Sequence, residues 1–383
     1  MTALSSAVRR ALPAAIVVLG VAASLSVGAD PLQAERGKGH GHGNGNNGAY
    51  QQHNLVSDQA GVADNMDANL VNAWGVAFNP NGFVWVADNG TGVSTLYDGQ
   101  GNINSLVVTI PTIDGTGTGV PTGITFNATN DFAIDSSTPS HFLFATEDGV
   151  IAAWSAGNAA VKMFPPGTTS TAVYKGIAIA ANGTEHLLYA ADFHNKRIDV
   201  FDPSFKPVNA PGGFVDPGIP TDFGPFNIMN INGDLHVAYA MTQPNSDDEA
   251  HGPGLGFVDV FDANGVLIRR IATRGQLNAP WGMALAPAGF GQFANALLVG
   301  NFGDGKITAF DLESGKSLGQ MRDASNSVIA IDGLWGLAFG NGLLSQPADV
   351  LFFAAGPSAE SHGLYGFIQP VSSTGGGGGG NGQ

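Results

Sequence analysis

The stretch that decides the fold runs from Asn72 to Gly92 and reads NAWGVAFNPNGFVWVADNGTG. It contains an apolar run, a turn rich in Asn, Pro and Gly, a second apolar run and a second turn at Asp-Asn-Gly. Short runs rich in Val, Ile, Phe and Tyr between such turns are typical of β-strands. One copy would indicate a hairpin, so the fold depends on whether the stretch recurs.

The stretch recurs five more times, and its later copies read PTGITFNATN, YKGIAIAANG, PFNIMNING, PWGMALAPAG and LWGLAFGNG. A second and a third apolar run follow each copy, and a fourth run is weaker in the second and third units. Glycine at one aligned position would let neighbouring units approach closely. The aligned residues, 48 to 55 positions apart, are Gly75, Gly123, Gly176, Asn227, Gly282 and Gly336.

A unit of about 50 residues with four antiparallel strands is typical of a propeller blade. We therefore predict an all-β, six-bladed β-propeller over residues 50–370. The sixth unit ends after its third strand, so we expect the segment YQQHNLVSD from Tyr50 to supply the fourth strand and close the ring. Closure would remove an exposed sheet edge. A β-sandwich is the alternative, but six units in phase favour the propeller.

The two ends of the chain differ from the repeats. Residues 1–29 combine Arg9 and Arg10, an apolar run and the small residues Val-Gly-Ala, which is typical of a cleaved export signal; an uncleaved anchor is the alternative. Residues 30–49 resemble a Gly-, His- and Asn-rich flexible linker, and residues 371–383 a Gly-rich tail. We expect a secreted, periplasmic or cell-surface protein whose mature chain does not span a membrane.

The composition restricts the classes of partner. The 383 residues carry a formal charge of −16, contain 56 glycines and lack cysteine. Strong negative charge disfavours nucleic acid and anionic membranes as partners. The absence of cysteine excludes a cysteine nucleophile and means that the fold must be stable without disulfides. We expect a monomer that binds a small molecule, a saccharide or a protein at the mouth of the channel.

The repeated phrase WGVAF…FVWVADNGTGVSTLYD resembles NHL-type and SMP-30/gluconolactonase-type six-bladed propellers. Together with the leader, the HNLVSD opening and the NAWG phrase, it resembles an uncharacterised family of secreted bacterial propellers. This resemblance covers residues 50–370 and implies the fold. It implies no single activity, because propellers include enzymes, binding modules and scaffolds.

The topology predicts one functional face. In each blade the start of the first strand and the end of the second lie at the same end, so polar residues at these points would surround one mouth. Such a ring suits a cation or a polyol, although the Asp-Asn-Gly and Asp-Gly pairs are also good turn formers. The ligand-face residues are Asn72, Asp88, Asn89, Asp148, His194, Asn301 and Asp304.

The SMP-30 resemblance implies one divalent ion (Ca²⁺, Mn²⁺ or Zn²⁺) at this mouth, held by carboxylates and amides from different blades, with a metal-bound water as nucleophile. Asn227 stands where the other units have Gly, and Asp332 precedes the last inner strand. The early Glu of that family is absent, because the first blade has Asn72 there. The predicted ligands are Asn227, Asp332, Asn278, Asp192 and Glu147.

Two hypotheses follow for function. The first is an exported binding or scaffold propeller whose ligand meets the Asp/Asn-rich face, and the alternative is a metal-dependent SMP-30-like lactonase or hydrolase. A histidine-based redox or lyase site is disfavoured, because only His194 and two loop histidines could approach the mouth. Long loops from Met241 and from Ala355 lie where other blades have short turns, and such loops commonly carry binding function.

Overall fold

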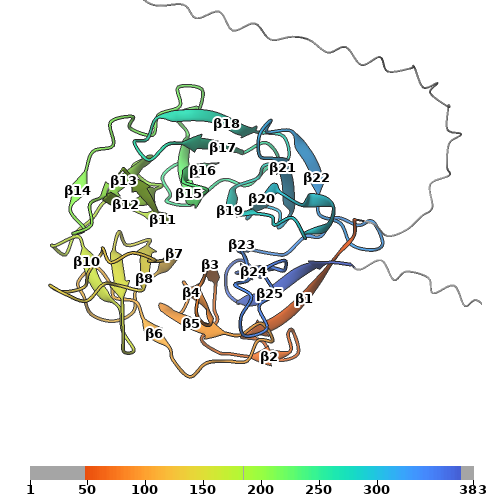
Figure 1. Ribbon diagram of the computed structural model, residues 1–383, viewed down its shortest axis with the longest axis horizontal. Coiled ribbons are helices and arrows are strands. Elements are labelled where there is room, and N and C mark those ends of the chain that lie inside the picture. Colours follow the sequence, from red (N-terminus) through yellow and green to blue (C-terminus); the bar gives the residue numbers. More distant parts are fainter. Residues whose placement is uncertain (1–47, 184, 372–383) are drawn as a thin grey trace, which may run out of the picture. The chain divides into compact units, whose positions relative to one another are not determined.

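The computed structural model describes residues 48–183 and 185–371. The leader, almost all of the linker and the tail from residue 372 lie outside these residues. Six antiparallel sheets stand around a central axis, which confirms the predicted six-bladed propeller (Figure 1). No helix of the described residues is long and apolar enough to cross a membrane.

The first three blades follow one another along the chain, each with four strands. Blade 1 consists of β3 (Ala73–Phe78), β4 (Val84–Asp88), β5 (Val93–Tyr97) and β6 (Val108–Thr109). Blade 2 consists of β7 (Pro121–Phe126), β8 (Phe142–Thr146), β9 (Ile151–Trp154) and β10 (Val161–Phe164). Blade 3 consists of β11 (Tyr174–Asn182), β12 (Glu185–Asp192), β13 (Arg197–Phe201) and β14 (Pro207–Val208).

The next two blades repeat this order, and a short 3₁₀ helix, η1 (Gly291–Phe293), lies in the first hairpin of blade 5. Blade 4 consists of β15 (Phe223–Ile231), β16 (Asp234–Met241), β17 (Gly256–Phe261) and β18 (Leu267–Thr273). Blade 5 consists of β19 (Pro280–Leu285), β20 (Ala296–Asn301), β21 (Ile307–Asp311) and β22 (Ser317–Gln320).

Blade 6 closes the ring with a strand from the other end of the domain. It contains β23 (Leu334–Phe339), β24 (Leu351–Ala355), β25 (Leu364–Pro370) and β1 (Tyr50–Ser57), as predicted. β1 pairs antiparallel with β25 over almost its whole length. A fifth strand that the sequence did not predict, β2 (Asn65–Met66), pairs parallel with the end of β1.

The core consists of six apolar layers, one between each pair of neighbouring blades, and a seventh, mainly aromatic cluster at the axis. The aligned glycines allow this packing near the axis. A Cβ atom on Gly75 would lie 2.6 Å from the carbonyl oxygen of Thr122 in the next blade, and one on Gly336 would collide with the carbonyl oxygen of Trp74 across the closure. The predicted role of these glycines in close approach is therefore confirmed.

Candidate functional site

The residue before each aligned residue lies at a bulge of the innermost strand, and four of these six residues pack together at the axis. The register of every inner strand shifts at this point, and such β-bulges re-aim side chains. Three of the six blades place tryptophan here, and the others place a polar residue or phenylalanine. The six residues are Trp74, Thr122, Lys175, Phe226, Trp281 and Trp335.

The tryptophans close the channel, and we call Trp74, Trp281, Trp335 and Phe302 the tryptophan plug. Trp335 stacks on Trp74 with ring centroids 3.5 Å apart and on Phe302 at 3.8 Å. Trp281 stands perpendicular to both other tryptophans, at 5.9 Å and 5.7 Å. The indole N–H groups of Trp74 and Trp335 are buried without a hydrogen-bond partner among the described residues, so the plug holds unsatisfied donors.

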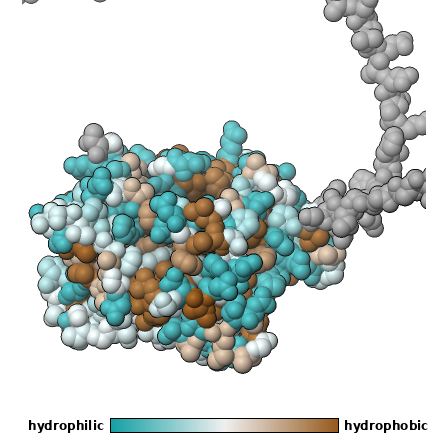
Figure 2. Space-filling model, turned by 60° about the horizontal axis from the view of Figure 1, so that its bottom comes forward, coloured by the Kyte–Doolittle hydropathy of each residue, from teal (hydrophilic) through white to brown (hydrophobic). Residues whose placement is uncertain are grey.

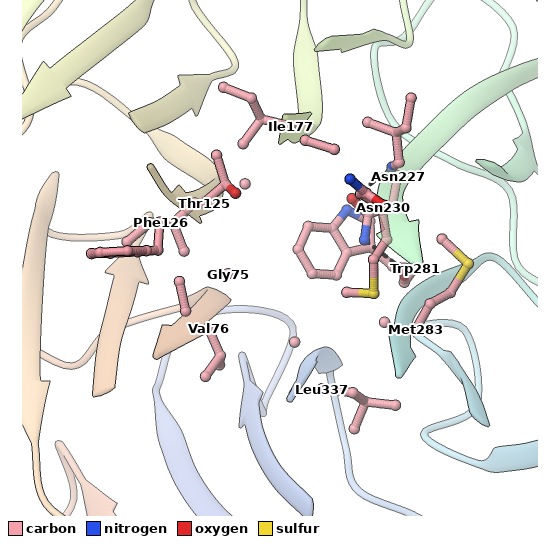
Figure 3. A pocket seen from close by; sticks show the side chains of 18 of the residues that line it. Gly75, Val76, Thr125, Phe126, Ile177, Asn227, Asn230, Trp281, Met283 and Leu337 are labelled. Atoms are coloured by element: carbon pink, nitrogen blue, oxygen red, sulfur yellow. Dashed lines mark hydrogen bonds between the residues drawn. The ribbon is translucent and has the colours of Figure 1, made fainter. Parts of the chain in front are cut away.

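A cavity of about 250 Å³ occupies the channel on the side of the plug toward which the inner strands run. Its wall mixes apolar side chains, such as Val76, Ile177 and Met283, with the polar residues Asn227 and Asn230. Figure 3 shows the Trp281 indole reaching toward the middle of this ring, next to Asn227 and Asn230. The cavity is therefore a narrow, closed-ended channel rather than a through-pore.

Asn227 has a structural partner. Its amide nitrogen donates to the carbonyl oxygen of Trp281 at 2.8 Å, and its side-chain oxygen accepts from the N–H of Ile228 at 2.8 Å. A Cβ atom on Gly176 would collide with the Asn227 side chain. Asn227 thus fills the space beside Gly176 and joins blade 4 to blade 5, which explains its departure from the repeat without a ligand.

Lys175 and Glu147 form a buried ion pair above the plug. The Lys175 ammonium lies 2.5 Å from Glu147 and 5.1 Å from the centre of the Trp74 ring, and the lysine is only 2% exposed. Burial alone would lower the pKa of Lys175. The charges of Glu147 and Glu249 outweigh that effect and raise the pKa above its ordinary value. Lys175 is therefore a fixed cation at the mouth.

Amides extend this pair across blades 1 and 6. Asn89 donates to the second oxygen of Glu147 at 2.8 Å, and Asn72 donates both to Asn89 and to Glu360, at 3.2 Å and 3.1 Å. The side-chain oxygen of Asn72 is buried without a partner among the described residues. The network therefore joins blades 3, 2, 1 and 6 around one opening.

A strained turn holds Glu360 in place. Three consecutive non-glycine residues, Ser358, Ala359 and Glu360, have φ angles of 59°, 54° and 64°. Left-handed conformation costs such residues about 1–2 kcal/mol each, and strain of this kind clusters at functional sites. Burial, reinforced by the charges of Glu249 and Glu147, raises the pKa of Glu360.

The long loop of blade 4 adds a third carboxylate. Glu249 is buried, and its carboxylate lies 3.1 Å from the imidazole of His251. The hydrogen bond with Glu249 raises the pKa of His251, and the charge of Glu360 acts in the same direction. We call Asn72, Asn89, Glu147, Lys175, Glu249, His251 and Glu360 the polar mouth. Its carboxylates outnumber its permanent cation by three to one.

The structure brings three of the predicted residues, Asn72, Asn89 and Glu147, together in the polar mouth, whereas the other ligand-face residues make separate contacts, some of them between blades. Asp88 is wholly buried and accepts from Thr95 inside blade 1, while Asp148 accepts from Thr146 and from the N–H of Ile113. His194 pairs with Asp247 at 2.5 Å. Asn301 and Asp304 bond each other, and Asn301 also bonds the turn before β19.

The predicted metal ligands lie in separate hydrogen-bonded groups. Asp192 accepts from Asn195 and from the N–H of Val173, Asp332 accepts from the N–H of Ser358, and Asn278 bonds Asn301 and the N–H of Gly252. Across residues 48–183 and 185–371, no group of three or more His, Asp or Glu side chains is placed to hold a metal ion. The five-residue metal set stays a prediction.

Sequence reasoning missed Glu360, which lies in the long loop from Ala355. His251 was one of the two loop histidines expected to be able to approach the mouth, but its pairing with Glu249 there was not predicted. The length of the two loops indicated the segments, whereas neither periodicity nor spacing indicated that Glu360 reaches the mouth.

Comparison with proteins of known structure supports the fold alone. Virginiamycin B lyase from Staphylococcus aureus matches with 13% identity and a TM-score of 0.50, over 84% of this chain and 99% of that chain. α-L-Arabinanase from Penicillium chrysogenum matches with 12% identity and a TM-score of 0.53, over 83% of this chain and 97% of that chain. No family model matches the sequence.

Comparison with curated proteins finds relatives in a virus. Uncharacterised protein R648 of Acanthamoeba polyphaga mimivirus is 36% identical over 296 residues, which are 74% of this chain and 72% of that protein. Uncharacterised protein L690 of the same virus is 35% identical over 301 residues, 74% and 77% of the two chains. These relatives give no support to the bacterial origin expected from the sequence. The chain belongs to the family of propeller proteins that includes mimivirus R648 and L690.

Proposed function

We propose that the protein is a binding propeller and that the polar mouth holds a small ligand carrying an ammonium or guanidinium group. The observation that carries this proposal is the convergence of Glu147, Glu249 and Glu360, from three blades, on one opening with a single fixed cation. A carboxylate can accept about four hydrogen bonds. Glu360 receives one from the described residues, so acceptor capacity remains for a donor-rich cation.

The negative charge of the protein, overall and around Glu360, also supports a cationic ligand. The formal charge of −16 would steer cations toward the protein. Burial is the main cause of the raised pKa of Glu360, and the charges of Glu249 and Glu147 add to it; a positive group beside Glu360 would offset this added repulsion. The export and monomeric state expected from the sequence remain part of this proposal.

The alternative function, a metal-dependent hydrolase, is supported by the same group of polar side chains at the mouth. Carboxylates and amides from several blades meet at the mouth, which is the kind of donor set that the SMP-30 resemblance implies, although Glu147 alone belongs to the predicted ligands. That function requires a bound divalent ion and turnover of a lactone or ester. Both are measurable outcomes of the experiment below.

A ligand screen by thermal shift tests the proposal. The probes are arginine amide, spermidine, succinate, glucose, Ca²⁺, Mn²⁺ and Zn²⁺, added singly to the protein. We expect the two organic cations to raise the melting temperature, and a Glu360→Gln variant to lose that shift. Glu313→Gln, at an exposed carboxylate of blade 5, is the matched control. A shift only with a divalent ion, with lactone hydrolysis, would replace the proposal by the hydrolase.

A further inference from the structure

A second cavity, of about 430 Å³, lies at the seam where β1 closes the ring between blades 6 and 1. We call it the seam pocket. It lies between the β23–β24 loop of blade 6, the β5–β6 loop of blade 1 and strands β1 and β25. Its volume falls within the range typical of small-molecule sites. None of its lining residues belongs to the polar mouth or to the channel cavity.

One wall of the seam pocket is apolar and partly aromatic. Leu55, Val350, Phe352 and Phe367 contribute to this wall; Phe367 is partly exposed, whereas the other three are buried. Phe352 and Phe367 meet edge to face with ring centroids 6.0 Å apart. Such a wall favours a flat apolar group, because aromatic rings bind each other in offset or edge-to-face arrangements.

A His–Asp pair lines the seam pocket beside Phe367, and Gln100, Ser345 and Gln369 are its other polar side chains. The Nε2 atom of His53 lies 2.6 Å from a carboxylate oxygen of Asp64, and the imidazole stacks on Phe367 at 5.2 Å. In a neutral imidazole the nitrogen facing a carboxylate carries the proton, which leaves Nδ1 as an acceptor. Nδ1 has no hydrogen-bond partner among the described residues. A ligand hydroxyl in the seam pocket can donate to Nδ1 of the neutral imidazole.

The surroundings of the seam pocket are unusual for a free surface. Val62, Met66, Leu343 and Leu344, all close to it along the chain or in the fold, are 41–56% exposed. Figure 2 turns the side of blades 1 and 6 toward the reader, and apolar patches lie there between hydrophilic side chains. Leu344 and Ser345 at the rim both have left-handed φ angles, 47° and 59°. Exposed apolar groups and backbone strain at one place indicate a binding site.

We propose that the seam pocket binds a small neutral phenol, with the aromatic ring against the partly exposed Phe367 and the hydroxyl donating to Nδ1 of His53. The Asp64 carboxylate disfavours an anionic ligand at the same place, because like charges repel. A phenol supplies a flat apolar body for this wall and a hydroxyl that can donate to Nδ1. This site is separate from the polar mouth, so it does not depend on the function proposed for the mouth.

Binding of 4-fluorophenol, followed by ¹⁹F NMR on the full chain, tests the proposal. We expect saturable binding, and weaker binding of 4-fluoroanisole, whose methylated oxygen cannot donate. His53→Phe should weaken 4-fluorophenol about three- to tenfold, the effect of one lost hydrogen bond, and leave 4-fluoroanisole unchanged. His186→Phe is the matched control, because His186 forms a similar pair with Asp131 at 2.8 Å and comparable exposure elsewhere.

A blocking variant locates the ligand. Gln369 lines the seam pocket from β25, and Gln369→Trp should abolish binding of both probes. Gln100→Trp, from the opposite loop, serves the same purpose if the first variant lowers the melting temperature. Absence of saturable binding to the wild-type protein would overturn the proposal. So would binding that survives both blocking variants, because the ligand would then occupy another place, such as the channel cavity.

Discussion

Removing the two members of the Lys175–Glu147 pair should have unequal effects on stability. The side chain of Lys175 is 2% exposed, whereas that of Glu147 is 27% exposed. Glu147→Gln leaves a buried ammonium without its nearest carboxylate, and breaking a buried pair in this way costs 3–5 kcal/mol. Glu249 gives partial compensation, so we expect a loss of about 3 kcal/mol, at the low end of that range.

Lys175→Met should cost less. The Met side chain can keep the apolar contact with Trp74, and Glu147 retains the hydrogen bond from Asn89 and access to water. We expect a loss of about 1 kcal/mol, typical of one hydrogen bond. The double variant should have about the same stability as Lys175→Met alone. In the double variant no buried charge is left without its partner, because both charges are removed.

Urea unfolding at pH 7 measures these differences. The slope of the unfolding free energy against urea concentration should stay unchanged, which shows that the variants unfold by the same reaction. The matched control is Asp304→Asn, which breaks the more exposed Lys306–Asp304 pair of 3.3 Å and should cost at most about 1 kcal/mol. Equal losses for the two single variants, or a double variant no more stable than Glu147→Gln, would refute the reasoning that Lys175 is a buried cation requiring its partner.

Three further changes test other parts of the structure. Ala359→Gly should stabilise the protein by about 1 kcal/mol, measured by urea unfolding, because glycine accepts the left-handed φ of 54°; a loss of stability would contradict the strained turn. Asn227→Gly should destabilise by about 1 kcal/mol through the lost bond to Trp281, without altering ligand binding at the mouth; lost binding would restore Asn227 as a ligand. Burial and the Asp216 charge, opposed by Arg270, raise the pKa of Asp259 to about 7. The folded state therefore holds that proton more tightly than the unfolded state, so the stability contributed by Asp259 is present at low pH and lost as pH rises toward 7. Asp259→Asn should remove this contribution to the pH dependence of the free energy of unfolding. An identical pH dependence in the variant would contradict the role assigned to Asp259.

The propeller architecture was predictable because the pattern of strands and glycines that produces it repeats along the chain. Gly75 and Gly336 recur in phase with the strands, and each allows the contact with the next blade that closes the ring. Strand β2 was not predictable, since two residues give no period. The departure at Asn227 was visible, but its hydrogen-bond partner, the carbonyl oxygen of Trp281, lies 54 residues away in another blade. The sequence alone could not show this link between blades, and the metal-ligand role of Asn227 stays a prediction.

Only those residues of the polar mouth that adjoin the ends of regular strands could be predicted from the sequence. Asn72, Asn89 and Glu147 adjoin strand ends, and the topology alone brought them to one face. Glu360 reaches the mouth through a left-handed turn followed by His362, whose imidazole lies 2.7 Å from Asp58. The course of this loop depends on contacts between segments that are distant in the sequence. A local pattern of residues therefore could not predict the position of Glu360.

The most direct test of the proposed ligand site is a calorimetric titration of arginine amide into the wild-type protein, Glu360→Gln and the control Glu313→Gln. Glu360 faces the opening with one hydrogen bond from the described residues, and a charged hydrogen bond is worth about 1.5–3 kcal/mol. We predict that Glu360→Gln weakens binding by about tenfold or more, whereas Glu313→Gln changes it less than twofold. Equal affinity in all three proteins, or no binding to any of them, would contradict a cation site at the polar mouth.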